Sequence, residues 1–235
     1  MQLPTLSFFL GLLATGSVAN AKLSIPAAKG YTKLPKAQVV SGNFDGGMKE
    51  FDRGIKCGNG ENGSGDAVFI LENGASISNV IIGAKQREGI HCKAACTITN
   101  VWFRDVCEDA ISLLGTGSVT ISGGGAQNAD DKVVQHNGRG TVTIKNFTVS
   151  KAGKVYRSCG NCTKNGGPRK VVITGLKATG VKEIVGINSN YGDTASVQGS
   201  CGGGTPCQEY IGVTKEKGGS SKKVSSKGAC KVSCK

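Results

Sequence analysis

The middle of the chain repeats one short pattern in which apolar and polar positions alternate. The segments "ASISNVIIG", "CTITNVWFRDV", "SVTISGGGAQ", "TVTIKNFTVS" and "KVVITGLKATG" run through β-branched residues to Asn or Gly, then to an apolar or small residue. Their isoleucines are Ile77, Ile98, Ile121, Ile144 and Ile173, so the steps are 21, 23, 23 and 29 residues. Such alternation predicts strands, and a step of about 20 to 25 residues predicts a solenoid.

The repeat also determines the fold class that we predict. Helices are disfavoured because 37 of the 235 residues are glycine and no segment keeps an apolar period of 3.6 residues for long. We therefore predict an all-β, single-domain, right-handed parallel β-helix, with about three short strands per coil. Asn79, Asn100 and Asn146, with Gly123 and Gly175 in the equivalent place, are expected at one turn that requires a left-handed conformation.

The two ends of the chain differ from its repetitive middle. Residues 1–21 contain an apolar stretch and end in Ala19-Asn20-Ala21, which is typical of a secretory signal peptide. We expect the protein to be secreted and not anchored in a membrane, and we expect the β-helix to span residues 22–210. Residues 211–235 are rich in Lys, Ser and Gly and are expected to form a flexible tail, unless Cys230 and Cys234 pair with the body.

Ten cysteines, an even number, indicate a disulfide framework that staples the fold of a secreted chain. Connectivity does not follow from spacing alone. Three pairs are close enough in sequence for local bridges: Cys92 with Cys96, Cys159 with Cys162, and Cys201 with Cys207.

Carboxylates gather in the segment "DVCEDAISLL", although the net charge of the chain is +13. Asp105, Glu108 and Asp109 lie within five positions, and Glu88 lies 21 residues before Asp109, about one coil earlier. Like charges this close repel unless a cation, a proton or a buried network stabilises them. Because Ca²⁺ takes six to eight oxygen ligands, the four carboxylates predict a calcium site. A solvated acidic patch paired with basic side chains is the alternative.

Basic residues follow the acidic segment at the same spacing. Lys132 lies 23 residues after Asp109, and Lys154 and Arg157 lie 22 and 25 residues after Lys132. One face of the solenoid would then carry an acidic rung followed by two basic rungs. This order of charges fits a polyanion that is bridged to the protein through a divalent metal.

The phrases "GIHC", "TITNVWFRDVCEDA", "DDKVVQHNGRGTVTIKNF" and "GKVYRSCG" resemble the secreted pectate lyases of polysaccharide lyase family 3, particularly the fungal and oomycete branch. The resemblance runs from about residue 42 to residue 210. It implies calcium-dependent cleavage of α-1,4-linked polygalacturonate by β-elimination, which gives 4,5-unsaturated oligogalacturonides. It also implies calcium ligands at Glu88, Glu108 and Asp109, with Asp105 beside them.

The resemblance further assigns catalytic roles to Lys132, Lys154 and Arg157, and a substrate-binding role to the two lysines. Glu61 matches an acidic residue of the family's cleft, whereas Leu114 stands where bacterial relatives carry a lysine. The family favours Arg157 as the base, but the pKa of arginine, about 12.5 or above, favours Lys132. Both candidates are kept, with Arg157 ahead of Lys132.

Two other functions are considered. Asp130 and Asp131 could act as the acid and base of a polygalacturonase, although the signatures of that hydrolase are absent. A non-catalytic secreted protein that binds pectin or acts as an elicitor could use the same basic face. Nucleic acid is disfavoured as a partner by the signal peptide and by the aromatic content of 5%. We expect a monomer whose partner is polygalacturonate or pectin, with no nucleic acid or membrane partner.

Overall fold

The structure is a computed structural model that describes residues 23–58 and 63–235. The predicted signal peptide and Glu61 lie outside the described residues. The described part contains strands and three 3₁₀ turns, η1 (Ser64–Asp66), η2 (Ser189–Tyr191) and η3 (Lys215–Lys217). The strands are β1 (Tyr31–Lys33), β2 (Gln38–Val40), β3 (Asn43–Asp52), β4 (Ala67–Leu71), β5 (Ala75–Ile82), β6 (Glu88–Cys92), β7 (Cys96–Phe103), β8 (Asp109–Leu113), β9 (Val119–His136), β10 (Gly140–Lys145), β11 (Thr148–Ser158), β12 (Arg169–Asn188), β13 (Thr194–Ser200), β14 (Thr205–Ile211), β15 (Lys222–Val224) and β16 (Cys230–Cys234).

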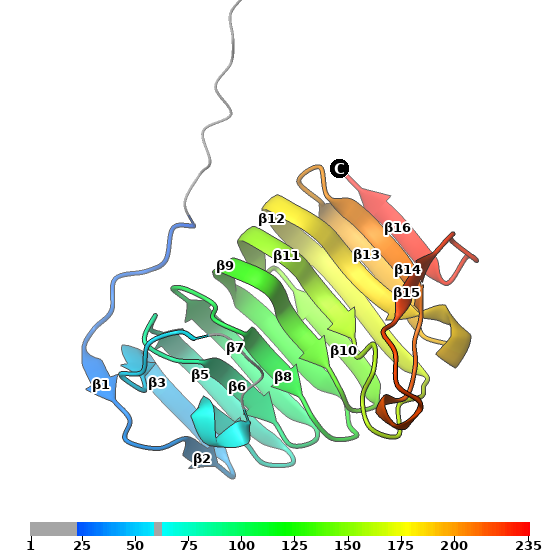
Figure 1. Cartoon of the computed structure of the whole chain (residues 1–235). Helices are drawn as coiled ribbons and strands as arrows, with labels where there is room; N and C mark the ends of the chain where they lie inside the picture. Colours follow the sequence, from blue (N-terminus) through cyan, green and yellow to red (C-terminus); the bar gives the residue numbers. More distant parts are fainter. Residues whose placement is uncertain (1–22, 59–62) are drawn as a thin grey trace, which may run out of the picture.

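These strands stack as the successive coils of a parallel β-helix (Figure 1). Among the described residues every strand pairing is parallel, except that β14 pairs antiparallel with β15. One ladder, which we call the cleft ladder, consists of β4, β6, β8, the ends of β9, β11 and β12, and β14. The apolar side chains of all the coils form one buried cluster inside the stack. The predicted all-β parallel β-helix is confirmed.

The isoleucines of the sequence repeat lie on top of one another. Ile77 pairs with Ile98, Ile98 with Ile121, Ile121 with Ile144, and Ile144 with Ile173. All five residues are buried and are at most 1% exposed. A step of one coil therefore returns the chain to the same place in the core, and the spacing of the repeat gives the register of the strands directly.

The Asn and Gly positions of the repeat form one stacked turn. Asn79, Asn100 and Asn146 have φ angles of 53°, 52° and 50°, and Gly123 and Gly175 have φ angles of 66° and 65°. This left-handed conformation favours glycine, and asparagine is among the few other residues that tolerate it. Within the stack the Asn100 side-chain amide donates a hydrogen bond to the side-chain oxygen of Asn79, with an N···O distance of 2.8 Å.

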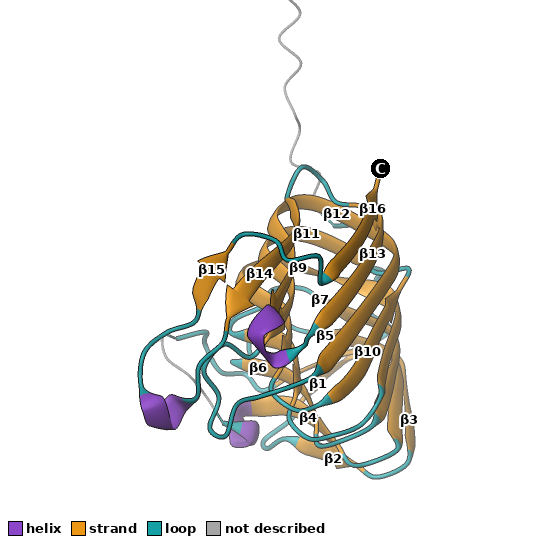
Figure 2. Ribbon diagram, turned by 90° about the vertical axis from the view of Figure 1, so that its right-hand side faces the viewer, coloured by secondary structure: helices purple, strands orange, loops and turns teal. Residues whose placement is uncertain are grey.

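The C-terminal residues join the solenoid. β16 adds to β13 as a further parallel strand, and β15 pairs with β14 on one flank of the molecule (Figure 2). Disulfides Cys201–Cys234 and Cys207–Cys230 join Cys230 and Cys234 to the body of the protein, so the C-terminal segment is held against the solenoid. The prediction of a local bridge between Cys201 and Cys207 is therefore wrong. The other disulfides are Cys57–Cys107, Cys92–Cys96 and Cys159–Cys162, and no described cysteine is free.

Candidate functional site: a cleft along the coils

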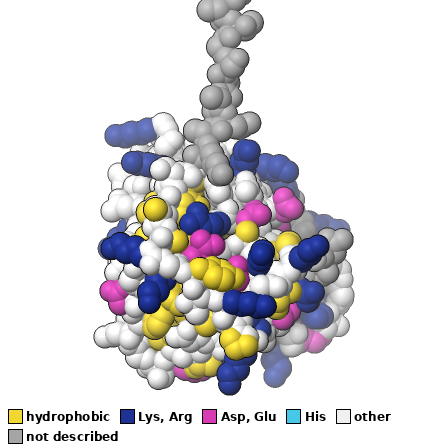
Figure 3. All heavy atoms as spheres, turned by 90° about the vertical axis from the view of Figure 1, so that its left-hand side faces the viewer, with side chains coloured by type: hydrophobic (Ala, Val, Ile, Leu, Met, Phe, Trp, Pro, Cys, Tyr) yellow, Lys and Arg dark blue, Asp and Glu magenta, His cyan; other side chains and the backbone are white. Residues whose placement is uncertain are grey.

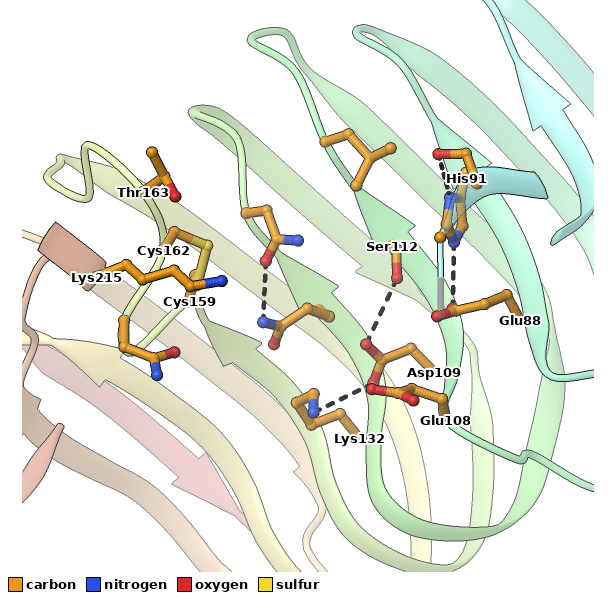
Figure 4. Close-up of a pocket in the computed structure, with 16 residues that line it drawn as sticks. Glu88, His91, Glu108, Asp109, Ser112, Lys132, Cys159, Cys162, Thr163 and Lys215 are labelled. Carbon is orange, nitrogen blue, oxygen red and sulfur yellow. Dashed lines mark hydrogen bonds and ion pairs between the residues drawn. A yellow bond between two sulfur atoms is a disulfide. The ribbon is translucent and has the colours of Figure 1, made fainter. Parts of the chain in front are cut away.

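A cleft of about 420 Å³ runs along the outside of the cleft ladder (Figure 4). Successive coils contribute side chains to it, and the Cys159–Cys162 loop closes one end. The side chains that line this cleft include Glu88, His91, Glu108, Asp109, Ser112, Leu114, Lys132, Gln135 and Lys215.

Strand register brings the predicted acidic and basic residues into one row. Ile90 pairs with Ile111, and extending this register by two residues places Glu88 beside Asp109. Asp109 pairs with Lys132, and Lys132 pairs with Lys154 on the next coil. The row therefore carries two carboxylates and then two ammonium groups. This is the order that the spacing predicts.

The acidic end of the cleft is buried and incompletely hydrogen-bonded. Glu88 and Asp109 are only 4% and 6% exposed. The Nε2 atom of His91 lies 3.1 Å from Glu88 Oε2, and the hydroxyl of Ser112 donates to Asp109 Oδ2 over 3.5 Å. Asp109 Oδ1 has no hydrogen-bond partner among the described residues, although Lys132 Nζ lies 3.5 Å away. Burial, together with the nearby charges of Glu88 and Glu108, raises the pKa of Asp109 to about 7 despite the opposing effect of Lys132.

These carboxylates fit the chemistry of a hard cation. Calcium is bound by carboxylate oxygens, and Asp109 Oδ1 is a buried oxygen whose hydrogen-bonding capacity is unused. Within residues 23–58 and 63–235, no three His, Cys, Asp or Glu side chains already converge on a single point as a formed metal site. The donor set of Glu88, Glu108 and Asp109 is therefore suited to calcium in its chemistry, and the side chains would have to move to close around the ion.

The lysines of the row are held by a carboxylate of their own. Asp131 Oδ2 lies 2.6 Å from Lys132 Nζ, and Asp131 Oδ1 lies 2.8 Å from Lys154 Nζ. Burial lowers the pKa of Lys132, but the charges of Asp109 and Asp131 outweigh this effect and the pKa is raised. Lys132 is thus a protonated group that faces the cleft. Lys154 lies beside it but does not line the cleft.

Arg157 belongs to a second row that faces the cleft, but its guanidinium points elsewhere. His91, Ser112, Gln135 and Arg157 pair in register along the coils, and the first three line the cleft. Arg157 is 6% exposed. Its side chain donates to the Ser158 carbonyl at 2.6 Å, the Asn188 side chain at 3.0 Å and the Ser221 hydroxyl at 3.0 Å.

The C-terminal segment covers this arginine. The guanidinium carbon lies 3.9 Å from the centre of the Tyr210 ring. Ser221 lies so close to Gly160 that a Cβ atom added to this glycine would be 2.5 Å from the Ser221 hydroxyl, so only glycine leaves room for the C-terminal segment here. Burial lowers the pKa of Arg157 despite the nearby Tyr210 and Glu183. Arg157 is therefore a buried cation just behind the wall of the cleft.

The structure separates the remaining predicted residues from the cleft. Asp105 is exposed and does not line it, and its backbone carbonyl accepts a hydrogen bond from Gln86. Sequence reasoning did not identify His91, Ser112 and Gln135 as lining residues. Their spacing of 21 and 23 residues repeats that of the acidic and basic row, so the same periodic signal could have found them.

Figure 3 shows the end of the solenoid where β1 to β3 lie, and Lys and Arg side chains are spread over this face instead of forming one patch. In the described part of the chain, no helix has the length and apolar character needed to cross a membrane.

Comparisons with known proteins agree with this architecture. The pectate lyase family profile matches residues 22–217. Probable pectate lyase E of Aspergillus clavatus is 56% identical over 212 residues, which cover 88% of this chain and 82% of that protein. Pectate lyase E of Emericella nidulans is 53% identical over 222 residues, which cover 87% of this chain and 87% of that protein.

Solved structures lead to the same family. The catalytic domain of a pectate lyase from Erwinia chrysanthemi matches with a TM-score of 0.71 and 34% identity over 84% of this chain and 95% of that domain. A structure of a pectate lyase from the same organism in complex with tetragalacturonic acid matches with a TM-score of 0.68 and 36% identity over 83% of this chain. This chain spans 66% of the length of that structure. The chain therefore belongs to the pectate lyase family and is a polysaccharide lyase that degrades pectin.

Proposed function

We propose that the cleft cleaves polygalacturonate by calcium-dependent β-elimination. One observation carries the proposal. The buried carboxylate of Asp109, whose Oδ1 atom has no hydrogen-bond partner among the described residues, shares a cleft with Glu88, Glu108 and the ammonium group of Lys132. The tetragalacturonic acid in the related Erwinia structure supports an acidic polysaccharide as the ligand.

In this proposal Glu88, Glu108 and Asp109 hold the calcium ion. Bound calcium supplies a Lewis acid that neutralises these carboxylates and stabilises negative charge on a galacturonate carboxylate. Asp105 has no part in this set, because it is exposed outside the cleft. Lys132 lines the same cleft and can reach the substrate beside these carboxylates.

The elimination requires a base in its deprotonated form. The base removes the proton at C5 of a galacturonate residue, the electrons form the C4–C5 double bond, and the C4–O bond breaks. The released oxygen takes up a proton, so that the products are a new chain end and a 4,5-unsaturated sugar. The adjacent carboxylate carries the developing negative charge, which the cations of the cleft stabilise.

Lys132 and Arg157 meet different requirements for this base. Lys132 faces the cleft, but Asp109 and Asp131 raise its pKa. The pKa of Arg157 is lowered by burial, but its guanidinium is covered by the C-terminal segment. We propose Lys132 as the base because it has access to substrate without rearrangement of the backbone. Lys154 does not line the cleft, so its role in substrate binding or catalysis stays a prediction; Asp131 holds its ammonium group beside that of Lys132.

We also propose that the protein works outside the cell on plant cell-wall pectin. The disulfides of the described residues support an oxidising compartment. A signal peptide in residues 1–21 would account for export.

The proposed reaction is tested by its product. Purified protein is incubated with polygalacturonate and calcium, and the ultraviolet absorbance of the unsaturated product is followed with and without a chelator. We expect product that forms only when calcium is present. New reducing ends without unsaturated product would indicate hydrolysis, and binding without either product would indicate a pectin-binding protein. Either result would overturn the proposal.

A further inference from the structure

The C-terminal segment adds a cation to the cleft. The 3₁₀ turn η3 lies beside the Cys159–Cys162 loop, and its first residue, Lys215, lines the cleft. In Figure 4 the Lys215 side chain extends past the Cys159–Cys162 disulfide into the cleft, on the side away from Glu88. The sequence repeat ends well before this residue, so its spacing gave no indication of this position.

Backbone hydrogen bonds hold Lys215 at the cleft. The amide of Val213 donates to the Gly160 carbonyl at 2.9 Å, and the amide of Lys215 donates to the Cys162 carbonyl at 3.1 Å. The Glu216 carboxylate accepts a hydrogen bond from the backbone amide of Lys164, with an N···O distance of 2.9 Å. These contacts join η3 to a loop that is itself closed by a disulfide. The backbone of Lys215 is therefore positioned in advance of any ligand.

The ammonium group of Lys215 differs from those of the other lysines at the site. Lys132 and Lys154 form ion pairs with Asp131, whereas Lys215 forms no ion pair with any carboxylate of the described residues. The nearest carboxylate in sequence, Glu216, is turned to the Lys164 amide. Lys215 is also exposed, so that its charge is available to a ligand.

We propose that Lys215 is a substrate-binding residue that holds a galacturonate carboxylate at the end of the cleft away from the acidic cluster. The inference rests on the proposed function and identifies a further specificity-determining residue of the same site. The cleft wall at Leu114 is apolar, so it offers a substrate carboxylate no positive charge. Lys215 supplies positive charge to this cleft from a segment that is remote in sequence. Because the ligand group is a carboxylate, the residue favours unesterified over methyl-esterified pectin.

The test compares Lys215→Gln with Lys217→Gln, a matched control on the same 3₁₀ turn. Both lysines are exposed and both changes remove one positive charge, but Lys217 does not line the cleft. At low salt we expect Lys215→Gln to raise KM for polygalacturonate about threefold to fivefold with kcat kept, as for loss of one exposed ion pair. Lys217→Gln should leave KM unchanged, and Lys215→Arg should restore it.

Binding measured by calorimetry separates this inference from the lyase assignment. Lys215→Gln should weaken tetragalacturonate binding by the same factor in the presence of calcium, even if no unsaturated product forms. The loss should shrink at high salt, because salt screens exposed charges. Equal KM values and equal affinities for Lys215→Gln and Lys217→Gln would overturn the inference. So would an equal weakening of binding to methyl-esterified tetragalacturonate, which lacks the carboxylates.

Discussion

Asp109 provides a prediction that links stability to calcium. Asp109 is 6% exposed, and its Oδ1 atom lacks a hydrogen bond within the described residues. An ionised group in this environment destabilises the fold. Asp109→Asn should therefore make the calcium-free protein more stable at alkaline pH while it removes a calcium ligand.

The magnitude follows from the pKa. The pKa of Asp109 rises from 3.8 to about 7 on folding, a change of about three units, chiefly because the carboxylate is buried. At about 1.4 kcal/mol per unit, ionised Asp109 lowers the free energy of unfolding by roughly 4 kcal/mol at pH 8. The Asp109 carboxyl group binds its proton more tightly in the folded state than in the unfolded state. The stabilisation by this proton is therefore complete below pH 3.8 and is lost as the pH rises through 7. Since the amide also leaves a buried polar group, the expected net gain is about 2 to 4 kcal/mol.

The assay is urea unfolding followed by circular dichroism at pH 8, with chelator or with calcium. Wild type should gain about 2.7 kcal/mol in calcium at one hundred times its dissociation constant, whereas Asp109→Asn should gain little. Asp105→Asn is the matched control, because it removes the same charge from an exposed position outside the cleft. The reasoning is refuted if Asp109→Asn is less stable than wild type in chelator, or gains as much stability from calcium.

Three further predictions concern the basic row and the core. Lys132→Gln should lower kcat by a factor of at least about one hundred in the assay of unsaturated product, as expected for loss of a general base; a change confined to KM would assign it to binding alone. Asp131→Asn should move the rising limb of the pH profile of kcat/KM to lower pH, because Asp131 helps to raise the pKa of Lys132; an unmoved limb would leave Arg157 as the base. Burial, aided by nearby arginines, lowers the pKa of His136 from 6.5 to about 3, so only the unfolded chain takes up a proton between these values. The free energy of unfolding should thus fall by about 2 to 3 kcal/mol from pH 6.5 to 4.5, and His136→Gln should lose this part of the slope in urea titrations; equal slopes would contradict the assignment.

The fold and the acidic and basic row could be predicted from the sequence for one physical reason. In a parallel solenoid each coil returns the chain to the same place, so a fixed spacing becomes a lateral contact. Ile98 thus lies between Ile77 and Ile121, and Asp109 lies beside Lys132. The same periodicity placed the left-handed turn at Asn79 and its equivalents.

The orientation of Arg157 could not be predicted in this way. Its backbone position follows the register with Gln135, but its guanidinium is directed by Ser221, 64 residues later, and by the Tyr210 ring. The segment that carries Ser221 and Lys215 lacks the strand repeat of the solenoid and contains few apolar residues. Its path depends on which cysteines pair, and spacing does not determine that connectivity.

The central claim is that the carboxylates of the cleft hold the calcium ion on which elimination depends. The most direct measurement is a crystal structure of Lys132→Gln with calcium and tetragalacturonate, since slow turnover should preserve the ligand. We expect a calcium ion about 2.3 to 2.6 Å from carboxylate oxygens of Glu88, Glu108 and Asp109, with a galacturonate carboxylate beside it. Tetragalacturonate in the cleft without an ion at these residues, or calcium bound only elsewhere, would contradict the account.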